Sequence, residues 1–157
     1  MLQLLNEILA KPDLIEGIAW KRSWYGPNER IIEKEDLGNS LFFVEEGVVR
    51  VLGETEIEGN VKLAPGFCDL QEGALFGDIC LYDSHKRTAS VVAVTNVCVL
   101  EIQSSELSHY LDAHPAFGYQ FLKELFKIMV DRLELANKRI EYLLAWGLKV
   151  HDINKYL

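Results

Sequence analysis

Residues 73–93 decide the fold, and their sequence is GALFGDICLYDSHKRTASVVA. A glycine turn leads into an apolar run long enough for one helical turn, and a polar loop then precedes a basic start to a strand. Backbone N–H groups at such a helical turn can face an anion, and the planar guanidinium of Arg87 suits a phosphate. Asp78 can accept hydrogen bonds from hydroxyl groups. The spacing fits a sugar phosphate, and it equally fits a solvated turn with a surface arginine.

The chain around this stretch, from about Trp24 to Ile102, has the pattern of short strands separated by glycine turns. Glu46-Gly47 predicts a tight hairpin turn, and the polar residues 54–60 predict an exposed hairpin loop. Such a succession indicates an all-β barrel, sandwich or jelly roll. The β-rich apolar runs cover 41–44, 48–52, 61–63 and 88–102.

Helical patterns flank this β-rich region. Residues 2–10 place apolar side chains on one stripe that Pro12 ends, and a short helical or irregular piece is expected after Asp13. Beyond the strands, Ser104 or Ser105 can cap a short helix. The expected division is an N-terminal helical segment (1–23), a jelly-roll core (24–114), and a long C-terminal helix with a short tail (115–157).

The long helix begins at Pro115, which fits a first helical position, and continues to about Trp146. Its apolar residues advance by alternate steps of three and four, which is coiled-coil spacing. The helix could pack on the chain's own barrel. We favour a seam with a second copy, because so long a helix outruns a barrel of this size. The homodimer is expected to form through Leu122, Leu125, Met129, Leu133, Ala136 and Ile140, with Leu143 and Gly147 continuing the stripe.

Composition excludes several classes of protein. The 157 residues are 49% hydrophobic and 25% charged, which excludes disorder of the whole chain. The net charge of −8 disfavours nucleic acid as a partner. There is no run of 18 apolar residues that could span a membrane, and no convincing secretion signal. We therefore expect a cytoplasmic protein with reduced thiols.

The sequence offers no pattern for a metal or for catalysis. The four histidines and three cysteines lack ligand spacing, so no metal, cofactor or disulfide framework is expected. Ser84 lies beside His85 without a third group, so the chain is not expected to be an enzyme. Trp20, Trp24 and Trp146 are interpreted as packing residues.

The sequence resembles the cyclic nucleotide-binding domain family over about 130 residues. Residues 76–81 and 87–91 are similar to that family's phosphate-binding cassette, in its order and with a common spacing. Residues 26–32 and 38–51 resemble its first turn and its second strand pair. Residues 111–115 are similar to the step before its long helix. The resemblance implies mainly β structure with flanking helices: an eight-stranded antiparallel β jelly roll between an N-terminal helix and a long C-terminal helix.

The resemblance also implies roles for individual residues. Arg87 would bind the exocyclic oxygens of a cyclic phosphate, and Asp78 would accept from the ribose 2′-hydroxyl. Leu75 and Val49 would form apolar walls. The cradle would be completed by the backbone amides of Gly77, Ile79 and Cys80 and by the Thr88 hydroxyl.

Three features depart from the family pattern. Asp78 replaces the family's glutamate, and its carboxylate falls about 1.5 Å short. Lys86 stands where many members have proline. The long helix has no serine or threonine to contact adenine, although Asn137 could substitute.

We therefore predict a non-enzymatic receptor for cAMP or cGMP that signals through its C-terminal helix. No DNA-binding domain is expected in this chain, which would be a stand-alone sensor or a fragment. The alternative is a protein-interaction or dimerisation module in which Arg87 pairs with Asp78 or Asp83 and no nucleotide binds.

Overall fold

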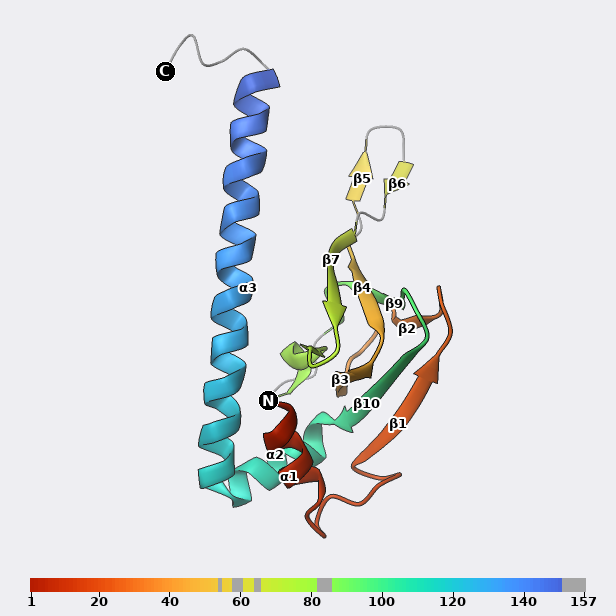
Figure 1. Cartoon of the computed structure of the whole chain (residues 1–157), viewed down its shortest axis with the longest axis vertical. Helices are drawn as coiled ribbons and strands as arrows, with labels where there is room; N and C mark the ends of the chain where they lie inside the picture. Colours follow the sequence, from red (N-terminus) through yellow and green to blue (C-terminus); the bar gives the residue numbers. More distant parts are fainter. Residues whose placement is uncertain (54, 58–60, 64–65, 82–85, 151–157) are drawn as a thin grey trace. The chain divides into compact units, whose positions relative to one another are not determined.

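The computed structural model describes residues 1–53, 55–57, 61–63, 66–81 and 86–150. These residues form ten strands, three α-helices and one short 3₁₀ turn (Figure 1). The chain divides into two units: Leu2–Pro115, and a second that contains Met1 and Ala116–Leu157. The elements are α1 (Leu2–Leu9), β1 (Trp20–Tyr25), β2 (Arg30–Ile32), β3 (Ser40–Glu46), β4 (Val48–Leu52), β5 (Thr55–Ile57), β6 (Val61–Leu63), β7 (Gly66–Gln71), β8 (Leu75–Phe76), the 3₁₀ turn η1 (Asp78–Cys80), β9 (Ser90–Ala93), β10 (Val97–Gln103), α2 (Ser104–Ala113) and α3 (Pro115–Val150).

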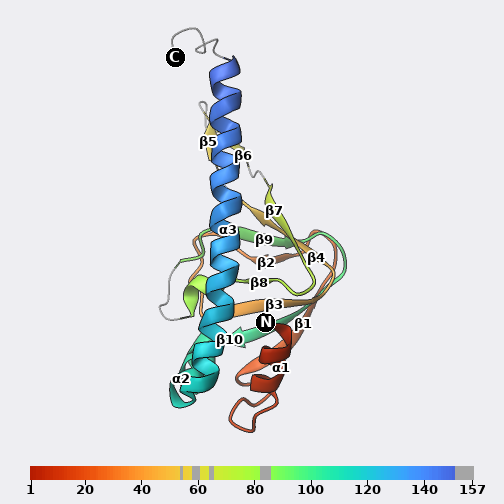
Figure 2. The same cartoon turned by 60° about the vertical axis from the view of Figure 1, so that its left-hand side comes forward.

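Eight of the strands form two four-stranded antiparallel sheets. The first has the order β1-β10-β3-β8 and the second β2-β9-β4-β7, while β5 and β6 form a separate ribbon (Figure 2). The predicted antiparallel jelly roll with an N-terminal helix and a long C-terminal helix is therefore confirmed.

The inner faces of the two sheets enclose an apolar core. Side chains alternate across a strand, so each strand sends every second residue inward. Phe42 and Phe76 are paired across β3 and β8, and their rings stack with centroids 5.1 Å apart. Val49 of β4 pairs with Ala93 of β9 in the same cluster. The other buried members are Ile32, Val44, Val91, Val97 and Val99.

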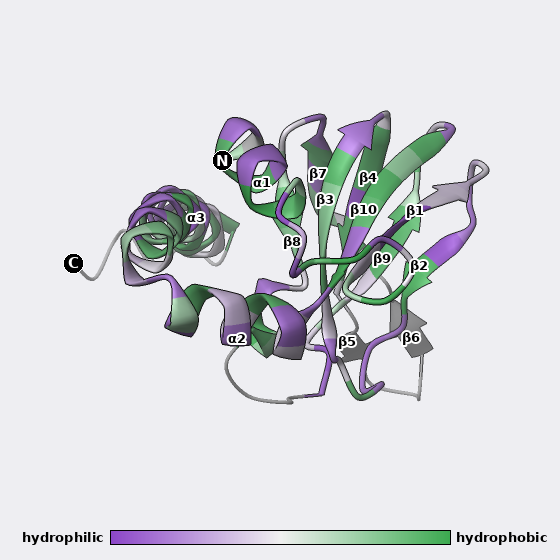
Figure 3. Cartoon of the chain, turned by 90° about the horizontal axis from the view of Figure 1, so that it is seen from below, coloured by the Kyte–Doolittle hydropathy of each residue, from purple (hydrophilic) through white to green (hydrophobic). Residues whose placement is uncertain are grey.

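The opposite face of the first sheet is also buried. Phe43 and Leu100 are paired across β3 and β10, and both are fully covered. On the helices, Leu5 of α1 and Leu107 of α2 are fully covered as well, and α2 contacts β10. This second layer explains why β3 and β10 are apolar on both faces, which Figure 3 shows as long green stretches.

Several local predictions need correction. The Glu46-Gly47 turn is not a hairpin, because it joins β3 to β4 and these strands belong to different sheets. The apolar run 88–102 divides into β9 and β10 at a turn over residues 94–96. Within the polar stretch 54–60, residues 55–57 form β5, whereas residue 54 and residues 58–60 lie outside the described residues.

The helix ends also differ from expectation. Gln103 is the N-cap of α2 and makes no side-chain capping bond, so neither Ser104 nor Ser105 caps this helix. The Ser104 hydroxyl is instead buried without a hydrogen-bond partner. Residues 13–19 form turns, and β1 begins at Trp20, ahead of the expected first strand.

The helix α3 begins at Pro115, as predicted, and continues to Val150, beyond the expected end. Many of its apolar side chains are exposed, including Leu122, Phe126 (69%), Leu133 (62%) and Ile140. Leu125 and Met129, which were predicted on the same stripe, are half-buried. No helix in the described part of the chain is both long enough and apolar enough to cross a membrane.

Candidate functional site

The candidate site begins where β8 leaves the first sheet. Gly77 follows β8 directly and adopts a left-handed conformation with φ of 70°, which favours glycine. A Cβ on Gly77 would lie 2.7 Å from Nη1 of Arg87. The turn η1 follows, in which the Leu81 N–H donates to the Asp78 carbonyl at 3.1 Å. Only a glycine allows this turn to close so tightly against the arginine.

The guanidinium of Arg87 is buried beside this turn, with 8% of the residue exposed. Its Nη1 donates to the Gly77 carbonyl at 3.1 Å, and its Nη2 donates to the Ser40 carbonyl at 2.7 Å. Nη1 also lies 3.5 Å from the Cys80 sulfur. The guanidinium stacks over the Phe42 ring at 5.6 Å. These partners are uncharged, so they fix the side chain without neutralising its charge.

The backbone of Arg87 is held by the turn that precedes β3. The Arg87 N–H donates to the Asp36 carbonyl at 2.8 Å, and the Glu35 N–H donates to the Arg87 carbonyl at 2.9 Å. Lys86 forms an isolated bridge with Leu37. The arginine is therefore anchored through its main chain as well as through its side chain.

Gly38 makes room for the guanidinium. A Cβ at this position would lie 2.5 Å from both Nε of Arg87 and the Cys80 sulfur. Together with Ser40, Gly38 belongs to the site, and sequence reasoning missed both. The only signal was that both residues belong to the stretch that resembles the family's second strand pair, where they gave no hint of a contact with Arg87.

The predicted site residues differ in where they lie. Gly77, Cys80 and Arg87 come together through the contacts above, and Asp78 is buried in η1 beside them in the chain. By contrast, Ile79 is 55% exposed, and Thr88 is exposed. Two residues expected as pocket walls, Leu75 and Val49, are fully covered. Asp83, a possible partner of Arg87, lies outside the described residues.

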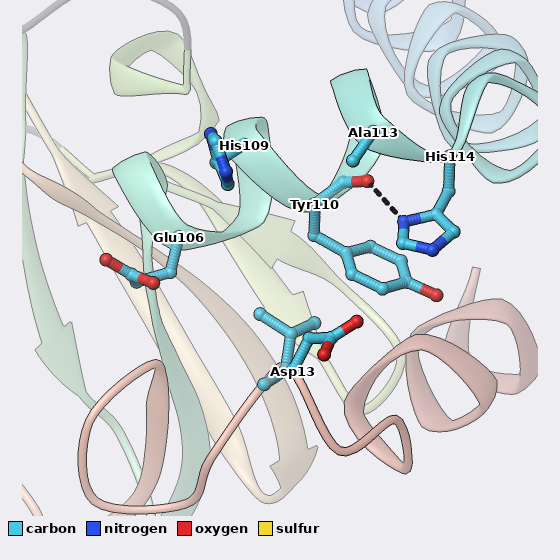
Figure 4. Close-up of a pocket in the computed structure, with 7 residues that line it drawn as sticks. Asp13, Glu106, His109, Tyr110, Ala113 and His114 are labelled. Atoms are coloured by element: carbon cyan, nitrogen blue, oxygen red, sulfur yellow. Dashed lines mark hydrogen bonds between the residues drawn. The ribbon is translucent and has the colours of Figure 1, made fainter.

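A separate pocket of about 310 Å³ lies along α2, between this helix and residues 13–14 (Figure 4). The rings of Tyr110 and His114 stack there at 4.2 Å, and the His114 Nδ1–H donates to the Tyr110 carbonyl at 3.0 Å. Burial, and to a lesser degree Asp13, raises the pKa of the Tyr110 hydroxyl. The pocket shares no lining residue with the Arg87 site, because its lining is Asp13, Leu14, Glu106, His109, Tyr110, Ala113 and His114.

Metal ligands do not gather in the described parts of the chain: no three His, Cys, Asp or Glu side chains there could hold an ion together. The three cysteines Cys68, Cys80 and Cys98 are free thiols.

Comparison with known proteins gives a family match and a set of relatives. The model of the cyclic nucleotide-binding domain matches residues 22–114. The human potassium/sodium hyperpolarization-activated cyclic nucleotide-gated channel 2 is 29% identical over 92% of this chain and 15% of that protein. Glutaminase 2 of Bradyrhizobium diazoefficiens is 30% identical over 78% of this chain and 18% of that protein. The chain thus spans less than a fifth of the length of these relatives.

Solved structures with the same fold come from several organisms. The catabolite activator protein of Thermus thermophilus has a TM-score of 0.65 at 23% identity, covering 90% of this chain and 59% of that one. A cyclic nucleotide-binding domain from Methylobacillus flagellatus has a TM-score of 0.67 at 20% identity, covering 78% and 66%. The regulatory subunit of a cAMP-independent protein kinase A from Trypanosoma brucei has a TM-score of 0.55 at 21% identity, covering 69% and 37%. At these identities the likeness shows the fold alone.

Proposed function

The chain belongs to the cyclic nucleotide-binding domain family, and from this premise we propose that it binds cAMP or cGMP at Arg87 as a non-enzymatic sensor. The observation that carries the proposal is the buried guanidinium, which donates to the carbonyls of Gly77 and Ser40 and has no charged partner among its hydrogen bonds in the described residues. A buried cation is costly until an anion compensates it. A cyclic phosphate would supply an anionic partner for this guanidinium.

The proposed contacts follow the cassette. Arg87 pairs with the exocyclic phosphate oxygens, and Asp78 accepts from the ribose 2′-hydroxyl. The remaining contacts come from the backbone amides of Gly77, Ile79 and Cys80 and from the Thr88 hydroxyl. In support, a cyclic nucleotide-gated channel matches nearly the whole chain.

We further propose that the output is carried by α3 in a homodimer. The predicted stripe of Leu122, Leu125, Met129, Leu133, Ala136 and Ile140 is supported at Leu122, Leu133 and Ile140, whose side chains are exposed apolar surface on α3. Exposed contiguous apolar surface of this kind is typical of an interaction face. The half-buried Leu125 and Met129 lie at its margin, and Phe126 extends it. The cytoplasmic location expected from the sequence stays a prediction.

The rival function is an interaction module that binds no nucleotide. One observation favours it: the guanidinium of Arg87 is already held inside the chain by the carbonyls of Gly77 and Ser40 and by the Phe42 ring. The Trypanosoma brucei neighbour, whose kinase is described as cAMP-independent, is consistent with such a departure.

Titration calorimetry with cAMP and with cGMP separates the two functions. Wild type is expected to bind at least one nucleotide, and Arg87→Ala should weaken binding by about 2–5 kcal/mol, because the phosphate would then be buried without its cation. Arg50→Ala, an exposed arginine paired with Asp69, is the matched control and should bind as wild type does. Thermal unfolding of each variant checks that it is folded. If folded wild type gives no binding heat with either nucleotide, the sensor function is contradicted and the interaction module without nucleotide is favoured.

A further inference from the structure

A pocket of about 340 Å³ lies at the β1 edge of the first sheet and has no part in the nucleotide proposal. The strand β10 runs between β1 and β3, as Figure 1 shows, and Cys98 of β10 pairs with Trp24 of β1 and with Glu46 of β3. The lining consists of Asn6, Arg22, Trp24, Glu45, Glu46 and Cys98.

A β-bulge places two consecutive carboxylates in this pocket. Cys98 pairs with Glu46, whereas Val99 pairs with Val44, so Glu45 is the extra residue on β3. In a regular strand Glu45 and Glu46 would point to opposite faces, but a bulge redirects one of them. Both carboxylates therefore line the same pocket.

The first carboxylate is already paired within the chain. Arg22 donates from Nε and Nη2 to the two oxygens of Glu45 at 2.8 and 3.2 Å, and its guanidinium lies 5.3 Å from the Trp20 ring. The guanidinium thus has an indole at its face and a carboxylate that accepts two hydrogen bonds at its edge. Such contacts favour arginine over lysine, because only a planar guanidinium can stack and bind in two places.

Trp24 and Glu46 offer the same two components again. Trp24 lies two residues beyond Arg22 on the same face of β1. Trp24 and Trp146 are each 65% exposed, so the interpretation of these two as packing residues is wrong. Glu46 is exposed and forms no ion pair with any residue in the described part of the chain. Burial, followed by Glu45 and Glu46, raises the pKa of the Cys98 thiol to about 11. The lining carries two carboxylates, on Glu45 and Glu46, against the single guanidinium of Arg22, so its formal charge is negative.

We propose that this pocket binds an arginine side chain of a protein partner, with its guanidinium stacked on Trp24 and paired with Glu46. The net charge of −8 makes the chain as a whole attractive to a basic partner. The inference stands independently of nucleotide binding, since neither Arg87 nor η1 contributes to the pocket.

A nuclear magnetic resonance titration of the whole chain tests the pocket with acetyl-Gly-Arg-Gly-amide as the probe. The indole N–H of Trp24 should shift saturably, with a dissociation constant on the order of millimolar. The indoles of Trp20, which donates to the Leu14 carbonyl, and of Trp146 on α3 should stay in place. Phenylalanine variants at Trp24 and Trp146 assign the signals. The same peptide with citrulline, which keeps the shape without the charge, should not bind.

Glu46→Gln should weaken binding of the probe by about two- to fivefold, the effect of losing an exposed ion pair. Glu72→Gln, at another exposed glutamate, is the matched control and should leave affinity unchanged. Retention of the Trp20 indole signal shows that each variant is folded. The proposal is overturned by any of four results: a stationary Trp24 signal, equal binding of the citrulline peptide, equal binding of a lysine peptide, or unchanged affinity in Glu46→Gln.

Discussion

The Arg87 site and the exposed face of α3 differ in what they bury: the first buries a charge, and the second leaves apolar side chains exposed. At Arg87 a charge is buried against neutral carbonyls, and the component proposed to complete the site is an anion. On α3, Leu133 and its neighbours expose apolar surface to water, and the component proposed to cover it is another apolar surface. The first proposal is argued from contacts inside the chain. The second needs a partner, so association experiments test it.

The largest effect is expected on α3. Leu133→Glu should convert a homodimer to monomer, because an unpaired charge buried at the contact costs at least about 3 kcal/mol. Gln120→Glu adds the same charge on another face of the helix and should leave the dimer intact. Light scattering at micromolar concentration measures the mass. A wild-type mass of 17.9 kDa, the mass of one chain, would contradict the dimer and remove this half of the comparison.

The comparison also explains what the sequence could predict. The strands β3 and β4 and the start of α3 at Pro115 follow from local patterns, and these predictions agree with the structure. The partners of Arg87 could not be predicted from local patterns. They are backbone carbonyls and the empty side-chain position at Gly38, which carry no residue-type signal and come close only when β3 and β8 pair.

Two other differences have a similar origin. The turn at Gly47 has the composition of a hairpin, but β3 pairs with β10 and β8 whereas β4 pairs with β7 and β9, so the chain changes sheets there. The bulge at Glu45 depends on pairing with β10, which is far away in the sequence. Periodicity identifies a strand, whereas register and sheet membership arise from long-range packing.

The second prediction concerns the space beside Arg87. Gly38→Ala should weaken nucleotide binding by about 1–3 kcal/mol, since the added methyl group overpacks the site and displaces either the guanidinium or the Cys80 side chain. Gly26→Ala, where a Cβ would meet its nearest atom at 3.7 Å, is the control. Calorimetry measures affinity, and thermal unfolding measures stability. Equal affinity in a folded Gly38→Ala protein would show that the position of the guanidinium does not limit binding.

The third prediction concerns the shortened carboxylate. Asp78→Glu should increase nucleotide affinity by up to about 1–2 kcal/mol, because the longer side chain can complete a charge-assisted hydrogen bond to the ribose. Titration with the matching 2′-deoxynucleotide is the control, since it lacks the hydroxyl and should gain nothing. Reduced affinity for both nucleotides would mean that the buried surroundings of Asp78 are adapted to the shorter residue.

The smallest effect is expected at Arg50, whose guanidinium is already paired with a carboxylate within the chain. Arg50 donates to both oxygens of Asp69, at 2.6 and 2.7 Å, on the exposed surface of β4 and β7. The hydrogen bond from Arg50 lowers the pKa of the Asp69 carboxyl below its usual value. A lowered folded-state pKa gives stability that is present above the unfolded-state pKa and disappears as the pH falls through the folded-state value. Asp69→Asn should therefore reduce the urea midpoint slightly at pH 7, and the difference from wild type should vanish in strong acid. A larger loss at low pH than at pH 7 would contradict this sign. Because solvent screens this exposed pair, the loss of unfolding stability at pH 7 should be small.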